Sequence, residues 1–224
     1  MTSKKLHLTN LCLTVLIIVV QLAAGIYYIF YATPYYYLLA FLTLLLLFVP
    51  KLLRLITRKP VSDELDFMII AFIFLASTVG LVLKGYSLIP YYDKLVHMLS
   101  GTVITLFGLC FYYMLNKDKT IRKEDAAVLI VFALAVSIAV AGLWEIGEYL
   151  VSILFHTDPQ NVRTTGVSDT MLDMIVCTAG SLFIIPFVLR YFKTNRKNLV
   201  MSVVLQYGHP PENAPDNGVN EIVA

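Results

Sequence analysis

The stretch AAVLIVFALAVSIAVAGLWEIGEYLVSILF, residues 126–155, is long and apolar enough to cross a membrane as a single helix. A membrane helix needs about 20 consecutive and mainly apolar residues, and this stretch exceeds that length. Its only charged side chains are Glu145 and Glu148, which lie near its C-terminal end. The stretch therefore predicts a membrane span with two carboxylates at a depth where exposure of charge to lipid is costly.

The whole chain has the composition of an integral membrane protein. Of its 224 residues, 58% are hydrophobic and 14% are charged, and the mean hydropathy is +0.77. Soluble domains carry about 25% charged residues. The net charge of +2 is too small to indicate a nucleic-acid partner. The three cysteines, Cys12, Cys110 and Cys177, lie in apolar runs and form no pattern typical of disulfides or zinc sites.

Six apolar segments predict an all-α polytopic membrane protein, a bundle of six transmembrane helices that fills residues 1–197. Helices suit lipid because they satisfy their backbone hydrogen bonds internally. We expect the spans at about residues 8–31, 35–50, 66–84, 94–115, 126–155 and 170–190. The first apolar run is longer than the 7–15 residues of a signal-peptide core, so we expect it to be retained. Residues 198–224 are polar and rich in Pro and Asn, and we expect a disordered cytoplasmic tail there.

The distribution of basic residues predicts the orientation of this bundle. Most of the 17 Lys and Arg residues fall at the N-terminus, in the second and fourth loops, and after the last span. Loops rich in Lys and Arg remain on the cytoplasmic side of a membrane. We therefore expect both termini in the cytoplasm and the first, third and fifth loops outside.

Three of the spans carry a pair of ligand-type side chains at the end predicted to be extracytoplasmic. The pairs are Asp93 and His97, Glu145 and Glu148, and Asp169 and Asp173. Residues three or four apart share one face of a helix. At a rise of about 1.5 Å per residue, the three pairs lie at similar depths. We therefore expect the six side chains to form one cluster.

Small residues continue each of these three faces toward the cytoplasm, and they allow membrane helices to approach closely. They are Gly101, Thr105 and Gly108; Ser137 and Ala141; and Cys177, Gly180 and Ser181. The three faces are therefore expected to point toward one another, which places the carboxylates inside the bundle.

Structural roles explain some of these residues when each is taken alone. Asp93 and Asp169 each begin a helix and can serve as N-caps. His97 can be a hydrogen-bonded core histidine, and Glu148 can reach the headgroups. Helix capping does not explain Glu145 and Glu148, because the helix dipole disfavours negative charge at a C-terminal end. It does not explain Asp173 either, since that residue lies one turn inside its helix. The combined pattern favours a shared functional site.

The residue types in this cluster predict a divalent metal ion as cofactor. Carboxylates and an imidazole suit Mg²⁺, Mn²⁺, Ca²⁺, Zn²⁺ or ferrous iron. A cation would relieve the repulsion among five carboxylates, and Lys94 or Arg163 can assist. A metal-activated water, with Glu148 as the candidate general base, would suit a hydrolase or transferase acting on a lipid or cell-envelope substrate.

Two other classes of function stay open. Acidic residues within a membrane also build pathways for cations or protons, so the protein can be a transporter. That hypothesis is less favoured because the cytoplasmic halves of these helices lack matching acids and no internal repeat is visible. The third class is a non-catalytic envelope protein whose cluster binds a cation or stabilises the bundle. The loop at 156–168 is expected to be solvated, or else to form a lid over the cluster.

The segments DKLVHMLSG, WEIGEYL and SDTMLDMIVCTAG, between Tyr92 and Gly180, resemble the YjdF-type bacterial membrane proteins, a family of unknown function. The resemblance implies a bacterial cytoplasmic membrane and marks the same six residues. The pattern is also distantly similar to that of VanZ-like proteins. Glu148 and Asp173 stand where that pattern has amides, so the site in this chain would be more acidic.

Overall fold

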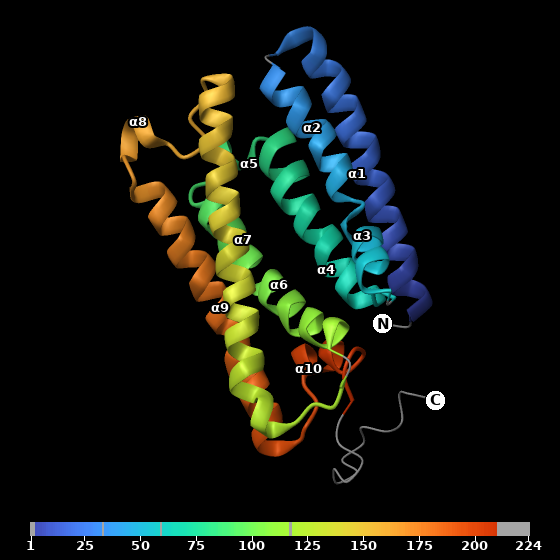
Figure 1. The fold of residues 1–224 in the computed structure, drawn as a ribbon. Helices are drawn as coiled ribbons and strands as arrows, with labels where there is room; N and C mark the ends of the chain where they lie inside the picture. Colours follow the sequence, from blue (N-terminus) through green and yellow to red (C-terminus); the bar gives the residue numbers. More distant parts are fainter. Residues whose placement is uncertain (1–2, 33, 59, 117, 210–224) are drawn as a thin grey trace.

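The chain folds as a bundle of helices, seen in a computed structural model that describes residues 3–209 except 33, 59 and 117 (Figure 1). Within these residues the backbone forms no β-strand, only one isolated bridge between Thr120 and His209. The helices are α1 (Ser3–Tyr31), α2 (Pro34–Leu46), α3 (Val49–Thr57), α4 (Asp63–Ile73), the π-helix η1 (Phe74–Val82), α5 (Gly85–Leu88), α6 (Tyr92–Leu115), the 3₁₀-helix η2 (Lys123–Asp125), α7 (Ala126–Phe155), α8 (Val162–Thr165), α9 (Ser168–Thr194) and α10 (Leu199–Val204). The prediction of an all-α polytopic membrane protein is confirmed.

Five of the described helical segments are long and apolar enough to cross a membrane. They are Lys4–Tyr31, Asp63–Val82, Tyr92–Leu115, Lys123–Phe155 and Ser168–Thr194. Helices α2 and α3 give a sixth span if the pair is counted as one, although it bends by 43°. Pro50 explains the break, because proline has no N–H to donate to the carbonyl of Leu46.

The first and last stretches of the described chain, near residues 3 and 209, lie at the same end of the bundle. The N-terminal end of α1 and the short helix α10 lie together there, whereas α5 and α8 lie toward the opposite end (Figure 1). This arrangement agrees with an even number of crossings. The end that holds α8 is the one for which the basic residues predict an extracytoplasmic position.

Helices α6, α7 and α9 pack closely through the small residues that the sequence singled out. A Cβ atom at Gly101 would collide with the backbone carbonyl of Cys177, and one at Gly180 with that of Met98. Across the junction the Oγ atoms of Ser137 and Ser181 lie 2.8 Å apart and are hydrogen-bonded. The expectation that these three faces point toward one another is confirmed, and it brings the polar ends of the helices together.

The segment after residue 198 differs from the disordered tail that we expected. Residues 199–204 form α10, whose side chains at Val200, Met201, Val203 and Val204 are buried. Asn198 caps this helix by accepting a hydrogen bond from the backbone N–H of Met201. The apolar run LVMSVVL is the physical reason, since it gains more from burial against the bundle than from exposure. The rest of the expected tail, residues 210–224, lies outside the described residues.

Candidate functional site

Asp93 and His97 face the same side of α6, as their spacing predicts. His97 Nε2 lies 3.6 Å from Asp93 Oδ1. Helix α6 begins after Tyr91, which adopts a left-handed conformation and provides no side-chain cap. Asp93 therefore lies inside the first turn, and its interpretation as an N-cap is wrong. The Ser100 hydroxyl donates to the backbone carbonyl of His97 and not to its imidazole ring.

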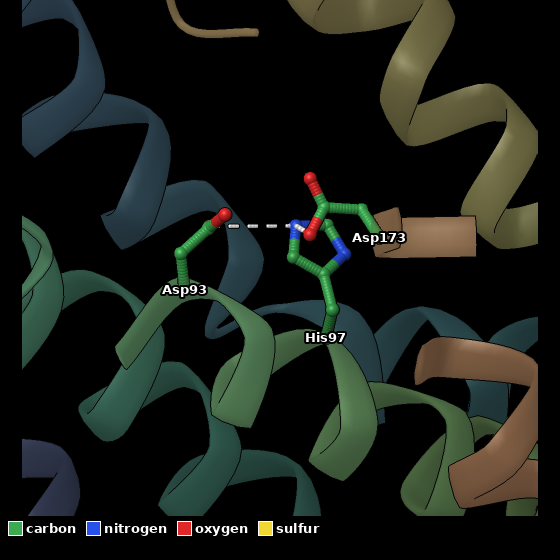
Figure 2. A group of neighbouring side chains, drawn as sticks. All are labelled: Asp93, His97 and Asp173. Atoms are coloured by element: carbon green, nitrogen blue, oxygen red, sulfur yellow. Dashed lines mark ion pairs between the residues drawn. The ribbon is translucent and has the colours of Figure 1, made fainter. Parts of the chain in front are cut away.

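Asp173 reaches the same point from α9. Its Oδ1 atom lies 3.8 Å from His97 Nε2, and its side chain is buried. One ligand atom each from Asp93, His97 and Asp173 lies within 4.8 Å of the other two. Figure 2 shows the three side chains converging, two from α6 and one from α9. We call these three residues the carboxylate–histidine triad.

Lys94 carries the positive charge that the triad faces. Its ammonium group donates to Asp169 at 2.6 Å, to Asp173 at 2.7 Å and to Asp93 at 3.0 Å. From the sequence, Lys94 was expected only to assist a cation at the cluster. In the structure it is the residue that joins α6 to the start of α9.

Asp169 belongs to this ion-pair network rather than to the triad. One carboxylate oxygen accepts from Lys94, and the other accepts from the Asn161 side-chain amide at 2.8 Å. The residue before α9, Val167, provides no side-chain cap, and Asp169 lies within the first turn. The N-cap interpretation is therefore also wrong for Asp169, which instead ties α9 to Lys94 and to the outer loop.

Glu145 lies inside the bundle but stands apart from the triad. Its side chain is 7% exposed, and Oε2 accepts from the Gln160 side-chain amide at 3.1 Å. Oε1 is buried and has no hydrogen-bond partner among the described residues. Glu145 remains within electrostatic range of His97. A buried carboxylate oxygen without a donor is costly.

Glu148 takes a local hydrogen bond. Its Oε1 accepts from the Trp144 indole N–H at 3.0 Å, one turn back along α7. The carboxylate lies within electrostatic range of Asp93 and Asp173, although it is not part of the triad. The six predicted residues thus gather at one end of the bundle, divided into a triad, an ion-pair network and two flanking glutamates.

The outer loop contributes two residues that were not expected from the sequence. The side-chain amide of Gln160 donates to the carboxylate and to the backbone carbonyl of Glu145. The side-chain amide of Asn161 donates to the carboxylate of Asp169. Asp158 accepts hydrogen bonds from the backbone N–H groups of Val162 and Arg163 and so holds the turn of α8. Nothing in the periodicity of the loop indicated these contacts. The side-chain amides of Gln160 and Asn161 therefore hold the loop to the acidic groups through hydrogen bonds.

The fold and this site together define the class of protein: a polytopic α-helical membrane protein with an acidic and histidine-containing cluster at one end of the bundle. Residues 11–194 match the model of a family described as predicted membrane protein (DUF2238). The chain belongs to this family. The expectation of a membrane family of unknown function is confirmed, and the distant likeness to VanZ-like proteins receives no support from the comparisons.

An uncharacterized protein of Thermotoga maritima is 33% identical to this chain over 150 residues. The alignment covers 66% of this chain and 73% of the relative. No solved structure matches the chain. The comparisons therefore establish the family but not a function.

Proposed function

We propose that the protein binds a divalent cation through the carboxylate–histidine triad of Asp93, His97 and Asp173. The observation that carries the proposal is that three ligand atoms of suitable type lie within 4.8 Å of one another. Metal–oxygen and metal–nitrogen bonds are about 2.0–2.6 Å long, so small side-chain movements can bring all three atoms onto one ion. One imidazole with two carboxylates suits Mn²⁺, Fe²⁺ or Zn²⁺.

The charge balance of the cluster supports a divalent ion. The Lys94 ammonium contacts three carboxylates, on Asp93, Asp169 and Asp173. One positive charge against three negative charges leaves an excess of two negative charges. Carboxylates held this close repel one another unless a cation or protons compensate them. A divalent cation would supply the missing charge.

The chemistry that such a site offers is hydrolysis or group transfer on a lipid or cell-envelope substrate at the membrane surface. A bound metal ion activates water or polarises a phosphoryl or carbonyl oxygen. Glu148 is the candidate general base, because it lies within electrostatic range of two triad carboxylates without being part of the triad. Its hydrogen bond from Trp144 holds the carboxylate in place.

The orientation that follows from the basic residues completes the proposal. Both termini would lie in the cytoplasm of a bacterial cell, and the triad would face the extracytoplasmic side. Reporter fusions test this orientation. A reporter that is active on only one side of the membrane would be attached at residue 209 and, separately, in the loop at 156–161. A cytoplasmic signal from the loop would contradict it.

Elemental analysis of the purified protein tests metal binding. We expect about one equivalent of a divalent metal after incubation and desalting, as for a single site. Asp173→Asn and His97→Ala should lower the affinity by more than about 100-fold, since even outer-shell changes cost about 10–100-fold. Glu124→Gln, an exposed substitution at the opposite end of the bundle, is the matched control. Equal metal content in all four proteins, or none in the wild type, would refute the proposal.

A further inference from the structure

A hollow of about 480 Å³ opens between α7, the α8 loop and the start of α9, beside the acidic cluster. Its walls are almost wholly apolar, and its polar side chains include Glu145 and Gln160. The apolar walls are formed by Ile146, Tyr149, Val162 and Val167. We call this the α7–α9 hollow.

The position of the hollow identifies the medium that fills it. Ile146 and Tyr149, which line the hollow, belong to the segment Lys123–Phe155. Thr170, which also lines it, belongs to the segment Ser168–Thr194. Both segments are apolar enough to span a membrane. An apolar hollow on such a surface is filled by hydrocarbon, because a void there would lose dispersion contacts. A hydrocarbon chain of a lipid is therefore the occupant that suits these walls.

Glu145 determines which headgroup suits this place. Its Oε2 is taken by Gln160, but Oε1 is buried and lacks a donor within the described part of the chain. The surroundings are negatively charged, since the acids of the cluster outnumber Lys94 and Arg163. A group that both donates hydrogen bonds and carries positive charge satisfies each condition, and a primary ammonium group has three N–H donors.

We infer that the α7–α9 hollow binds a lipid with a primary ammonium headgroup, of the ethanolamine phospholipid type, with one chain along the apolar walls and the ammonium at Glu145. The inference rests on the proposed function in one respect: the headgroup phosphate of such a lipid would then face the metal at the triad. Binding itself requires only the hollow and Glu145.

Native mass spectrometry of the full-length protein in detergent, with a chelator present, tests the inference. The probes are phosphatidylethanolamine, phosphatidylcholine and phosphatidylglycerol with identical acyl chains. Phosphatidylcholine keeps the positive charge but has no N–H donor. We expect the ethanolamine lipid to bind about tenfold more tightly than the choline lipid, as one charge-assisted hydrogen bond would give.

Variants separate the headgroup from the chain. Glu145→Gln should reduce binding of the ethanolamine lipid to the level of the choline lipid. Val167→Trp, at a position that is 69% exposed, should fill the hollow and weaken all three lipids. Glu124→Gln should bind like the wild type. Equal binding of the ethanolamine and choline lipids, tighter binding of the glycerol lipid, an unchanged preference in Glu145→Gln, or undiminished binding of the three lipids to Val167→Trp would overturn the inference.

The outcome is separable from that of the metal experiment. The triad does not include Glu145, and the lipid titration contains no free metal. Loss of the lipid preference with unchanged metal content would refute only the lipid site. A lipid preference in a protein that binds no metal would refute only the proposed metal function.

Discussion

Replacement of Lys94 by Met should destabilise the protein, because it removes the one ammonium group that contacts the acidic cluster within the described residues. Lys94 lies between α6 and α9 and donates to three carboxylates at 2.6–3.0 Å. The side chain of Asp173 is 4% exposed and that of Asp169 is 12% exposed, so water screens these two pairs poorly. Methionine has a flexible, unbranched side chain that is only one atom shorter, and it removes the charge.

The size of the effect follows from the exposure of these pairs. Removal of one partner from a buried ion pair costs about 3–5 kcal/mol, whereas an exposed pair contributes about 0–1 kcal/mol. The Lys94 side chain is itself 20% exposed, which favours the lower end of the buried range. We expect a loss of about 3 kcal/mol in the free energy of unfolding. For a chain of this size that lowers Tm by about 6–12 °C.

A thiol-reactive fluorescent dye measures this change in detergent solution. Cys110 and Cys177 are free and buried, so they react only when the bundle opens, and exposed Cys12 gives a constant background. Lys123→Met, an exposed substitution at the opposite end, is the matched control. A Tm of Lys94→Met within about 2 °C of this control would refute the assignment of Lys94 as the joining charge.

The same variant distinguishes a metal site from a purely structural ion-pair network. Without Lys94 the three aspartates need another cation, so Mn²⁺ or Zn²⁺ should stabilise Lys94→Met more than the wild type. A metal at 100 times its dissociation constant adds about 2.7 kcal/mol, close to the expected loss. If neither ion raises the Tm of the variant, the cluster is a structural network of charges.

Two further predictions concern the packing that holds the site. Gly180→Leu should abolish accumulation of folded protein in detergent extracts, because the leucine side chain would overlap the backbone carbonyl of Met98. Gly142→Ala should be tolerated, because the space around Gly142 is open. Similar size-exclusion profiles for the two variants would contradict the close approach of α6 and α9. Met201→Ala in α10 should cost about 2–5 kcal/mol in the dye assay, and Leu199→Ala, 82% exposed, should cost little. Equal shifts would contradict burial of α10.

Hydropathy and helical spacing predict most of this fold because the membrane imposes simple rules. The expected span at 126–155 has the same bounds as α7, and the small residues on three faces predict the packing of α6, α7 and α9. Helix α10 was missed because six residues are too few to register as a span. Its apolar residues and the Asn198 cap are nevertheless visible in the sequence.

The site was predicted as a group but not in its details. Spacing of three or four residues places Asp93 with His97 and predicts their common face. It excludes Lys94, which lies about 100° around the helix from Asp93. Lysine nevertheless reaches back, because its long flexible stem can carry the ammonium across to a neighbouring helix. The contacts of Gln160 and Asn161 depend on the path of an irregular loop, which no periodicity describes.

The atoms of Asp93 and Asp173 determine how the metal and Lys94 would share the cluster. Asp93 uses Oδ2 for Lys94 and keeps Oδ1 toward His97, so it can serve both cations at once. Asp173 presents the same atom, Oδ1, to Lys94 and to His97. A metal at the triad must therefore displace Lys94 from this oxygen or turn the carboxylate to present Oδ2. Since Asp173 is the most deeply buried of the three aspartates, this exchange would control the affinity of the proposed site for a cation.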